Sequence, residues 1–239
     1  MLVVGFPAGP WGTNCWVVAP AAGEQCVIVD PGKDAVDGID EVVREHGLSP
    51  VAVLLTHGHI DHVWSVVPVC GARGIPAYIH TDDVYRLADP MGAIAGQTAA
   101  MLESMSLGRL TSAEPDDLRP LTDGTVLELA GLHLTVDHAP GHTEGSVMFR
   151  RAGDGDVPPV LLSGDVLFEG SIGRTDLPGG DHGAMLASLT AKVLPLDDET
   201  VVLPGHGSTT TVGRERAANP YLQALSERHR SAAAPTKGL

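Results

Sequence analysis

The run THGHIDH, which begins at Thr56, places three histidines and one aspartate within six positions, directly after an apolar run typical of a buried strand. Residues i and i+2 of an extended backbone share a face, so the rings of His57 and His59 can reach one metal ion. Asp61 and His62 follow a bend, from which they can reach a second ion or the far side of the first. This spacing differs from the i, i+4 histidine pair of helical zinc proteases, and it predicts a metal site at the end of a strand.

Three more candidate ligands lie in glycine-rich turns that follow predicted strands. They are His142 in APGHTEG, Asp165 in SGDVLFEG and His206 in LPGHG. Turns after strands can present functional groups while the core stays intact, and Gly58 removes a side chain that would crowd such a site. Five histidines and two aspartates approach the ligand count of a two-metal hydrolytic site. The remaining histidines lack this context and are interpreted as structural or surface residues: His46, His80, His133, His138, His182 and His229.

The elements expected to position these side chains alternate between strands and helices. The pattern predicts strands at 2–6, 15–18, 26–29, 51–55, 77–79, 125–129, 133–137, 146–149, 160–162 and 200–203. Helices are predicted at 35–46 (ended by Gly47), 63–71, 81–88, 97–106, 182–193 and 213–228. Two such halves indicate a layered α/β (α+β) architecture in a single domain over residues 1–228. Residues 229–239 are expected to form a disordered tail.

The composition argues against several classes of protein. Fifteen basic residues against thirty acidic ones give a net charge of −15, which opposes the phosphate neutralisation that nucleic-acid binding requires. No apolar stretch approaches the ~20 residues of a membrane span, and the start MLVVGFPAGPWG lacks the features of a secretory signal. Cys15, Cys26 and Cys70 form no CxxC pair and are interpreted as small buried side chains. We therefore expect a cytoplasmic protein.

The motifs, taken together, resemble the metallo-β-lactamase superfamily. The resemblance rests on THGHIDH, on the Gly-His pairs at 141–142 and 205–206, and on the Gly-Asp pair at 164–165. It covers nearly the whole chain, to about residue 225. It implies a four-layer αββα sandwich that holds its metals at one edge, between the two sheets.

The metal ligands of that family carry over onto seven positions of this sequence. By motif, one metal would be held by His57, His59 and His142 and the other by Asp61, His62 and His206, with Asp165 as the bridge. Asp61 would also orient the reactive water. Asp30 in IVDPG matches a family loop beside the metals, and we expect its carboxylate to accept the second N–H of a ligand histidine.

The resemblance is closer in the second half of the chain. The runs GDVLFEGSIGRTDLPGGD and VVLPGHGSTTTVGRERAANPYL are similar to short bacterial glyoxalase-II-like hydrolases and to persulfide dioxygenases. Arg174 and Asp176 in GRTD match this pattern, either as a structural salt bridge or as substrate-side residues. The C-terminal helix is expected to be anchored by Arg214, Arg216 and the step Asn219-Pro220.

These features predict a metal-dependent hydrolase that cleaves a thioester of the S-2-hydroxyacyl-thiol kind with a metal-bridging hydroxide. The leaving thiol has a pKa of ~8.5, so it can depart as thiolate with little help from a general acid. We expect two divalent ions, with zinc favoured and iron or manganese open. Only residues 207–239 follow His206, so the glutathione-gripping region of long glyoxalase II enzymes is largely missing and the identity of the thiol stays open.

A second hypothesis is a mononuclear iron dioxygenase that oxidises a persulfide with only His57, His59, His142 and Asp165 as ligands. The full second set of candidate ligands favours hydrolysis. A lactonase of the same fold is a further alternative, whereas β-lactamases of this fold are exported and RNA-processing nucleases need a basic surface. The expected partner is a small-molecule thioester, with neither nucleic acid nor a membrane.

Overall fold

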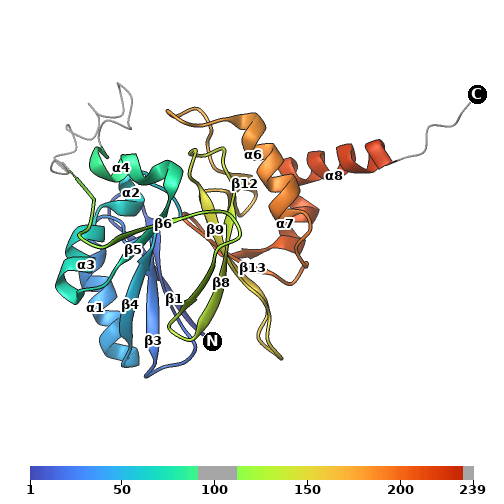
Figure 1. Cartoon of the computed structure of the whole chain (residues 1–239). Helices are drawn as coiled ribbons and strands as arrows, with labels where there is room; N and C mark the ends of the chain where they lie inside the picture. The colour runs from blue at the N-terminus through green and yellow to red at the C-terminus, as the bar shows by residue number, and fades with distance from the viewer. Residues whose placement is uncertain (91–111, 234–239) are drawn as a thin grey trace, which may run out of the picture.

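The computed structural model describes the backbone of residues 1–90 and 112–233, with the side chains of these residues up to 227. Two six-stranded sheets pack face to face, and helices cover the outer face of each sheet (Figure 1). The predicted four-layer αββα sandwich is therefore confirmed. The helix predicted at 97–106 lies outside the described residues.

The first sheet has the strand order β1-β2-β3-β4-β5-β6. Its strands are β1 (Leu2–Ala8), β2 (Thr13–Ala19), β3 (Gln25–Val29), β4 (Ser49–Leu54), β5 (Ala77–His80) and β6 (Leu118–Leu121). The strands from β1 to β3 pair antiparallel and those from β3 to β6 pair parallel. Strand β6 was not predicted, because Arg119 and Pro120 interrupt its apolar pattern. A proline is tolerated there since β6 is an edge strand.

The second sheet has the order β14-β13-β10-β9-β8-β7. Its strands are β7 (Val126–Leu129), β8 (Leu132–His138), β9 (Val147–Arg151), β10 (Val160–Gly164), β13 (Val201–Pro204) and β14 (Thr210–Thr211). A small hairpin joins β11 (Leu167–Phe168) to β12 (Ser171–Ile172). The two-residue strands β11, β12 and β14 were not predicted, because so short a run shows no periodicity.

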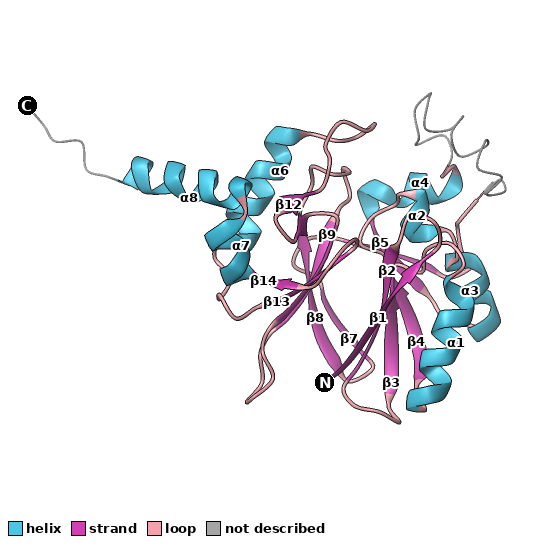
Figure 2. Ribbon diagram, turned by 180° about the vertical axis from the view of Figure 1, so that it is seen from behind, coloured by secondary structure: helices cyan, strands magenta, loops and turns pink. Residues whose placement is uncertain are grey.

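Helices flank each sheet on the side that faces away from the other sheet (Figure 2). On the first sheet these are α1 (Ala35–His46), α2 (Ile60–Val63), α3 (Val66–Arg73), the 3-10 turn η1 (Thr81–Asp83) and α4 (Val84–Ala88). On the second they are α6 (His182–Ser188), the π-helical η2 (Leu189–Val193), α7 (Val212–Ala218) and α8 (Pro220–Ala233). Helix α1 ends at Gly47 as predicted, with φ 64°.

Four predicted helices are each divided between two elements. Those expected at 81–88 and 182–193 only change helix type, from η1 to α4 and from α6 to η2. Of the helix expected at 63–71, Val63 ends α2 and residues 66–71 lie in α3, with Ser65 as the N-cap of α3. The helix expected at 213–228 breaks at Asn219, whose ψ is 120°, because the residue before a proline avoids the helical region. Helix α8 then continues to Ala233, since serine and alanine here permit helix. The backbone at 229–233 is thus helical where a disordered tail was expected.

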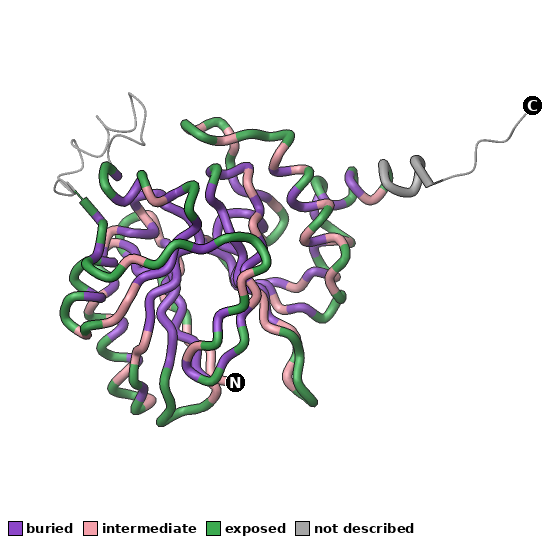
Figure 3. Tube along the Cα trace, in the orientation of Figure 1, coloured by how far each residue is buried: buried purple, intermediate pink, exposed green. Residues whose placement is uncertain are grey.

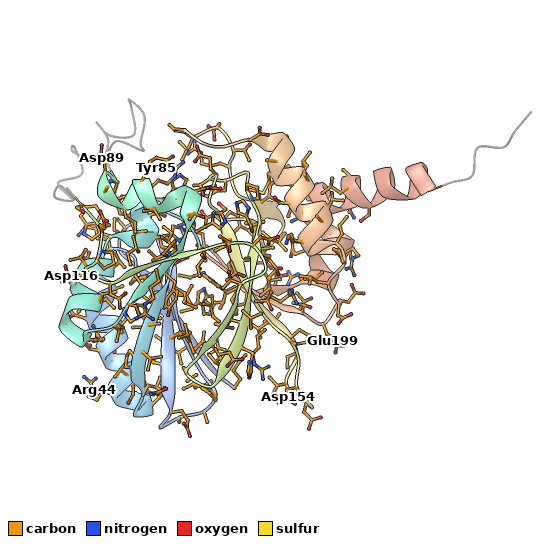
Figure 4. All side chains as sticks on the ribbon, viewed as in Figure 1. Arg44, Tyr85, Asp89, Asp116, Asp154 and Glu199 are labelled. Carbon is orange, nitrogen blue, oxygen red and sulfur yellow. The ribbon has the colours of Figure 1, made fainter. Side chains whose placement is uncertain are left out.

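Three apolar clusters fill the three interfaces of the sandwich. Strand β2 shows how one sequence serves two of them: Cys15 and Val17 pack toward the helices, while Trp16 and Val18 pack toward the other sheet. Because both of its faces are covered, β2 is apolar from Cys15 to Ala19 rather than alternating. Figure 3 shows this burial along the strands. Charged side chains labelled in Figure 4, such as Arg44 and Glu199, lie at the periphery.

The three cysteines are free thiols buried in the apolar core, as the sequence indicated. Burial raises the pKa of Cys26 to about 11 and that of Cys70 to about 12, so both stay protonated at neutral pH. Within the described part of the chain, no helix is long and apolar enough to cross a membrane.

Candidate metal centre

The seven predicted ligands follow the C-terminal ends of four strands. His57 and His59 come just after β4, and Asp61 and His62 lie on the short helix α2. The remaining ligands follow β8, β10 and β13 in the other sheet, and they are His142, Asp165 and His206. Strands β10 and β13 run parallel, so their ends meet at the same edge of the sheet. The sequence run and the three turns therefore converge where the two sheets face each other.

Three imidazoles form the first cluster. Nε2 of His142 lies 2.8 Å from Nδ1 of His59 and 3.2 Å from Nε2 of His57. All three residues are buried. Nitrogens this close, each with a lone pair available, are arranged as the ligands of one cation.

Two imidazoles and a carboxylate form the second cluster. Oδ2 of Asp61 lies 3.1 Å from Nε2 of His206 and 3.4 Å from Nε2 of His62. The two Nε2 atoms are 3.3 Å apart. His62 is fully buried, whereas the side chains of Asp61 and His206 are 19% and 29% exposed. The second cluster is therefore the one that opens toward solvent.

Asp165 lies between the clusters and reaches both. Its Oδ1 is 3.4 Å from Nε2 of His62, and its Oδ2 is 3.4 Å from Nε2 of His142 and 3.6 Å from Nε2 of His206. Within the described residues, Oδ1 is buried and has no hydrogen-bond partner. A buried carboxylate oxygen without a donor is the observation in this structure that best fits the ligand of a cation.

The outer ring nitrogens show that the inner ones are free to bind metal. Nδ1 of His142 donates to the carbonyl oxygen of Arg174 at 2.8 Å, and Nδ1 of His62 donates to Oδ2 of Asp30 at 2.9 Å. A carbonyl and a carboxylate only accept, so Nδ1 carries a proton in both rings, and in the neutral ring the inward Nε2 offers its lone pair to a metal. This is the usual arrangement around a metal-binding histidine.

Asp30 supports His57 as well, through Thr56. Its carboxylate accepts from the backbone N–H of Thr56 at 2.8 Å and from the Thr56 hydroxyl at 2.6 Å. Because that hydroxyl donates to Asp30, its oxygen can accept the Nδ1 proton of His57, 3.0 Å away. Asp30 thus holds His62 directly, in the manner predicted for one ligand histidine, and it holds His57 through one intermediate.

Charges within the site suit a cation. Burial lowers the pKa of His57 and lowers that of His59 to about 3, so both rings are neutral at pH 7. Burial would also lower the pKa of His62, but the carboxylates of Asp61, Asp165 and Asp30 outweigh it and raise that pKa. The carboxylates therefore require positive charge at this point, and a divalent cation would supply it.

A pocket of about 400 Å³ lies over the centre. Its lining includes the partly exposed candidate ligands Asp61 and His206. Its walls are largely apolar and are made by Trp11, Ile60, Phe168 and Leu177. Arg174 also lines the pocket, and its guanidinium makes a two-pronged ion pair with Asp176, with both N–O distances at 2.7 Å. Both of these side chains are exposed.

Gly58 has a different neighbour from the one expected. A Cβ at this position would lie 2.7 Å from Cβ and 2.8 Å from Cδ of Arg86, so glycine makes room for a buried arginine rather than for the metal site itself.

Near the C-terminus, Arg216 donates to the carbonyls of Leu194 and Leu196, which is the anchoring role predicted for it.

Two supporting residues were missed by sequence reasoning. Thr13 donates its hydroxyl to Oδ2 of Asp61 at 3.1 Å, and Thr56 connects Asp30 to His57. Thr56 stands inside the THGHIDH run, so its position was a usable signal. The role of Arg174 was also missed in part, because it acts on His142 through its backbone carbonyl, which no side-chain pattern reveals.

Comparison with known proteins places this geometry in a family. The model of the metallo-beta-lactamase superfamily matches residues 8–206, and the chain belongs to that superfamily. It is a metal-binding enzyme of the metallo-hydrolase type.

Individual relatives are similar over nearly their whole length. A probable metallo-hydrolase of Bacillus subtilis, YqgX, is 38% identical over 92% of this chain and 97% of its own. The hydroxyacylglutathione hydrolase GloC of Haemophilus influenzae is 32% identical over 92% of this chain and 98% of its own.

Two solved structures are also similar. The B3 metallo-beta-lactamase BLEG-1 has a TM-score of 0.79 at 40% identity, covering 92% of this chain and 99% of that one. TTHA1623, described in a di-iron-bound form, has a TM-score of 0.73 at 36% identity, covering 93% and 100%.

Proposed function

We propose that this chain hydrolyses thioesters of the S-2-hydroxyacyl-thiol kind with two divalent ions. The observation that carries the proposal is Asp165, whose two oxygens face the two ligand clusters at the base of an apolar pocket. The 32% identity to the hydroxyacylglutathione hydrolase GloC supports the choice of substrate.

In this proposal His57, His59 and His142 hold one ion, and Asp61, His62 and His206 hold the other. When bound, two such ions lower the pKa of a shared water from ~15.7 toward ~7 and polarise the carbonyl that is attacked. Zinc is the metal we propose, because the donors are imidazoles and carboxylates. Iron and manganese accept the same donors.

Side chains of the protein orient the attacking water and limit the access of other water. The Asp61 carboxylate, held by the Thr13 hydroxyl at 3.1 Å, faces the pocket and can accept a hydrogen bond from the attacking water. The apolar side chains of Trp11, Phe168 and Leu177 limit access of other water to the reacting carbonyl. A thiol with a pKa of ~8.5 leaves as thiolate, so no dedicated general acid is required.

β-Lactam hydrolysis is a second candidate, favoured by the 40% identity to the B3 metallo-beta-lactamase BLEG-1. The same centre would attack a lactam carbonyl. The leaving amide nitrogen is far more basic than a thiolate, so this reaction needs a proton donor that a thioester does not. We therefore rank it below thioester hydrolysis.

A substrate panel tests the proposal. Purified protein with measured metal content would be assayed against lactoyl thioesters of several thiols, a lactone, a β-lactam and a persulfide. We expect the highest kcat/KM with a thioester, and two ions per chain. One iron per chain with oxygen uptake on the persulfide would overturn the proposal in favour of a dioxygenase. A higher kcat/KM on the lactone or the β-lactam would overturn the choice of substrate.

A further inference from the structure

Asp83 gathers donors from separate parts of the chain, although nothing in its local sequence marks it as functional. It ends η1, directly before α4, and its side chain is completely buried. Its Oδ2 accepts from the backbone N–H of Gly58 at 2.7 Å and from the Thr143 hydroxyl at 2.8 Å. Its Oδ1 accepts from the backbone N–H of Gly145 at 2.9 Å. A buried carboxylate with this many donors is fixed in place.

The donors belong to the two loops that carry the first ligand cluster. Gly58 stands between His57 and His59, and Thr143 directly follows His142. The two loops come from different sheets, and a backbone hydrogen bond from the Val147 N–H to the Thr56 carbonyl, at 2.8 Å, joins the segments beside them. The Asp83 carboxylate joins the loops themselves, because each of its oxygens contacts the loop of His142 and one also contacts Gly58.

Arg86 extends the connection to a third loop. It is fully buried and donates from Nε to Asp83 Oδ1 at 3.1 Å. Its Nη2 donates to Glu144 at 2.6 Å and to the Pro178 carbonyl at 3.0 Å. Pro178 lies in the loop whose Arg174 carbonyl orients His142. The Asp83–Arg86 pair therefore contacts both loops that carry the first cluster and the loop that orients His142.

The contact between Asp83 and the loop of His142 depends on a glycine at position 145. A Cβ there would lie 2.6 Å from the backbone nitrogen of Asp83 and 2.7 Å from its Cβ and Cγ. Only glycine allows the loop of His142 to approach so closely. The second cluster is supported by other residues. Thr13 donates to Asp61, and Asp30 accepts from His62.

We propose that Asp83 is a positioning residue for one ion only, the one held by His57, His59 and His142. It sets the distance between the loop of His57 and His59 and the loop of His142. This inference rests on the proposed two-ion centre but not on the identity of the substrate.

The test compares stepwise metal affinities, measured by competition with a chelator, in the wild-type chain and in Asp83→Asn. Residues that orient metal ligands typically change metal affinity by about 10–100-fold. We expect a loss of this size for one of the two ions and little change for the other. The visible spectrum of the cobalt-loaded protein should lose the contribution of one site.

Three further variants make the result specific. Gly145→Ala keeps the carboxylate but displaces the loop, and it should weaken the same ion, whereas Gly71→Ala, where an added Cβ meets nothing within 4 Å, should not. Asp137→Asn removes another buried aspartate that is paired with an arginine, Arg150 at 2.7 Å, and should leave both affinities unchanged.

The outcomes separate this inference from the proposed function. Equal weakening of both ions, or unchanged affinities with only a lower melting temperature, would overturn the role of Asp83 and make it purely structural. A wild-type chain that binds fewer than two ions would overturn the two-ion centre and this inference with it. Two ions in the wild type, with no thioester hydrolysis, would overturn the substrate while leaving the Asp83 test intact.

Discussion

Asp165 is the side chain that contacts both clusters. One of its oxygens faces His62 in the second cluster, and the other faces His142 in the first. The individual ligands were accessible from sequence, since HxH spacing and glycine-flanked His or Asp at strand ends are local patterns. Thr13 and the Arg174 carbonyl were not, because their roles arise from contacts between segments far apart in the chain. Thr56 lies inside the ligand run, so its position was a usable signal, but its partner Asp30 lies 26 residues upstream. Local patterns thus identify the ligands, whereas the groups that orient them require the tertiary structure.

Removing a ligand should remove the metal without unfolding the chain. His59→Ala or Asp165→Ala should lose more than the ~10–100-fold in metal affinity that is typical of residues that only orient a ligand, and activity should fall with it. Metal analysis, kcat/KM and circular dichroism would check this. His133→Ala is the matched control, because that side chain is 75% exposed on β8. Hydrolysis by a metal-free ligand variant would contradict the assignment.

The ion pair at the pocket mouth predicts an effect on substrate charge. Arg174 lowers the pKa of Asp176 to about 2, so the guanidinium is neutralised at working pH. Asp176→Ala should free it and lower KM for an anionic thioester slightly, because an ion pair this exposed is weak. KM for an uncharged thioester should not change. Equal shifts in both KM values would show that Arg174 does not contact the substrate.

At the scale of elements, the site depends on where strands end. The apolar run in β4 predicted a buried strand, and its end presents His57 and His59 as expected. Strand β6 was not predicted, because its partner β5 lies far upstream and Pro120 interrupts the apolar pattern of a strand. The break between α7 and α8 follows from Pro220, but helical periodicity on both sides concealed it.

The α7–α8 junction should contribute to stability without affecting chemistry. Asn219 is buried, donates to the Ser171 carbonyl at 3.0 Å and accepts from the N–H of Tyr221 at 3.1 Å. Asn219→Ala should lower the free energy of unfolding by about 1–3 kcal/mol, since buried partners lose their hydrogen bonds. Denaturant unfolding would measure this, with metal content as the control. A loss of metal at unchanged stability would instead tie this junction to the site.

At the scale of the whole molecule, the candidate ligands come from both halves of the sandwich, so bound ions would link one half to the other. The four-layer architecture was available only through the resemblance, since alternating strands and helices fit several layered folds. The net charge of −15 affects solubility and association with other molecules, and it did not help to predict the fold.

Chelation should therefore weaken the sandwich without abolishing it. Ligand binding at 100 to 1,000 times Kd stabilises a protein by about 2.7–4.1 kcal/mol, and removing the ions should cost a similar amount. The three apolar clusters remain, so the metal-free chain should still unfold cooperatively at a lower temperature. Calorimetry with and without a chelator would test this, and an identical melting temperature would argue against ions that join the two halves.

The most direct measurement is anomalous diffraction from crystals of the metal-loaded protein. We expect two peaks about 3.5–4 Å apart, the spacing of two-metal hydrolytic sites. One peak should lie among His57, His59 and His142 and the other among Asp61, His62 and His206, with Asp165 in contact with both. A single peak confined to the first cluster, in protein loaded with excess metal, would contradict the two-ion centre.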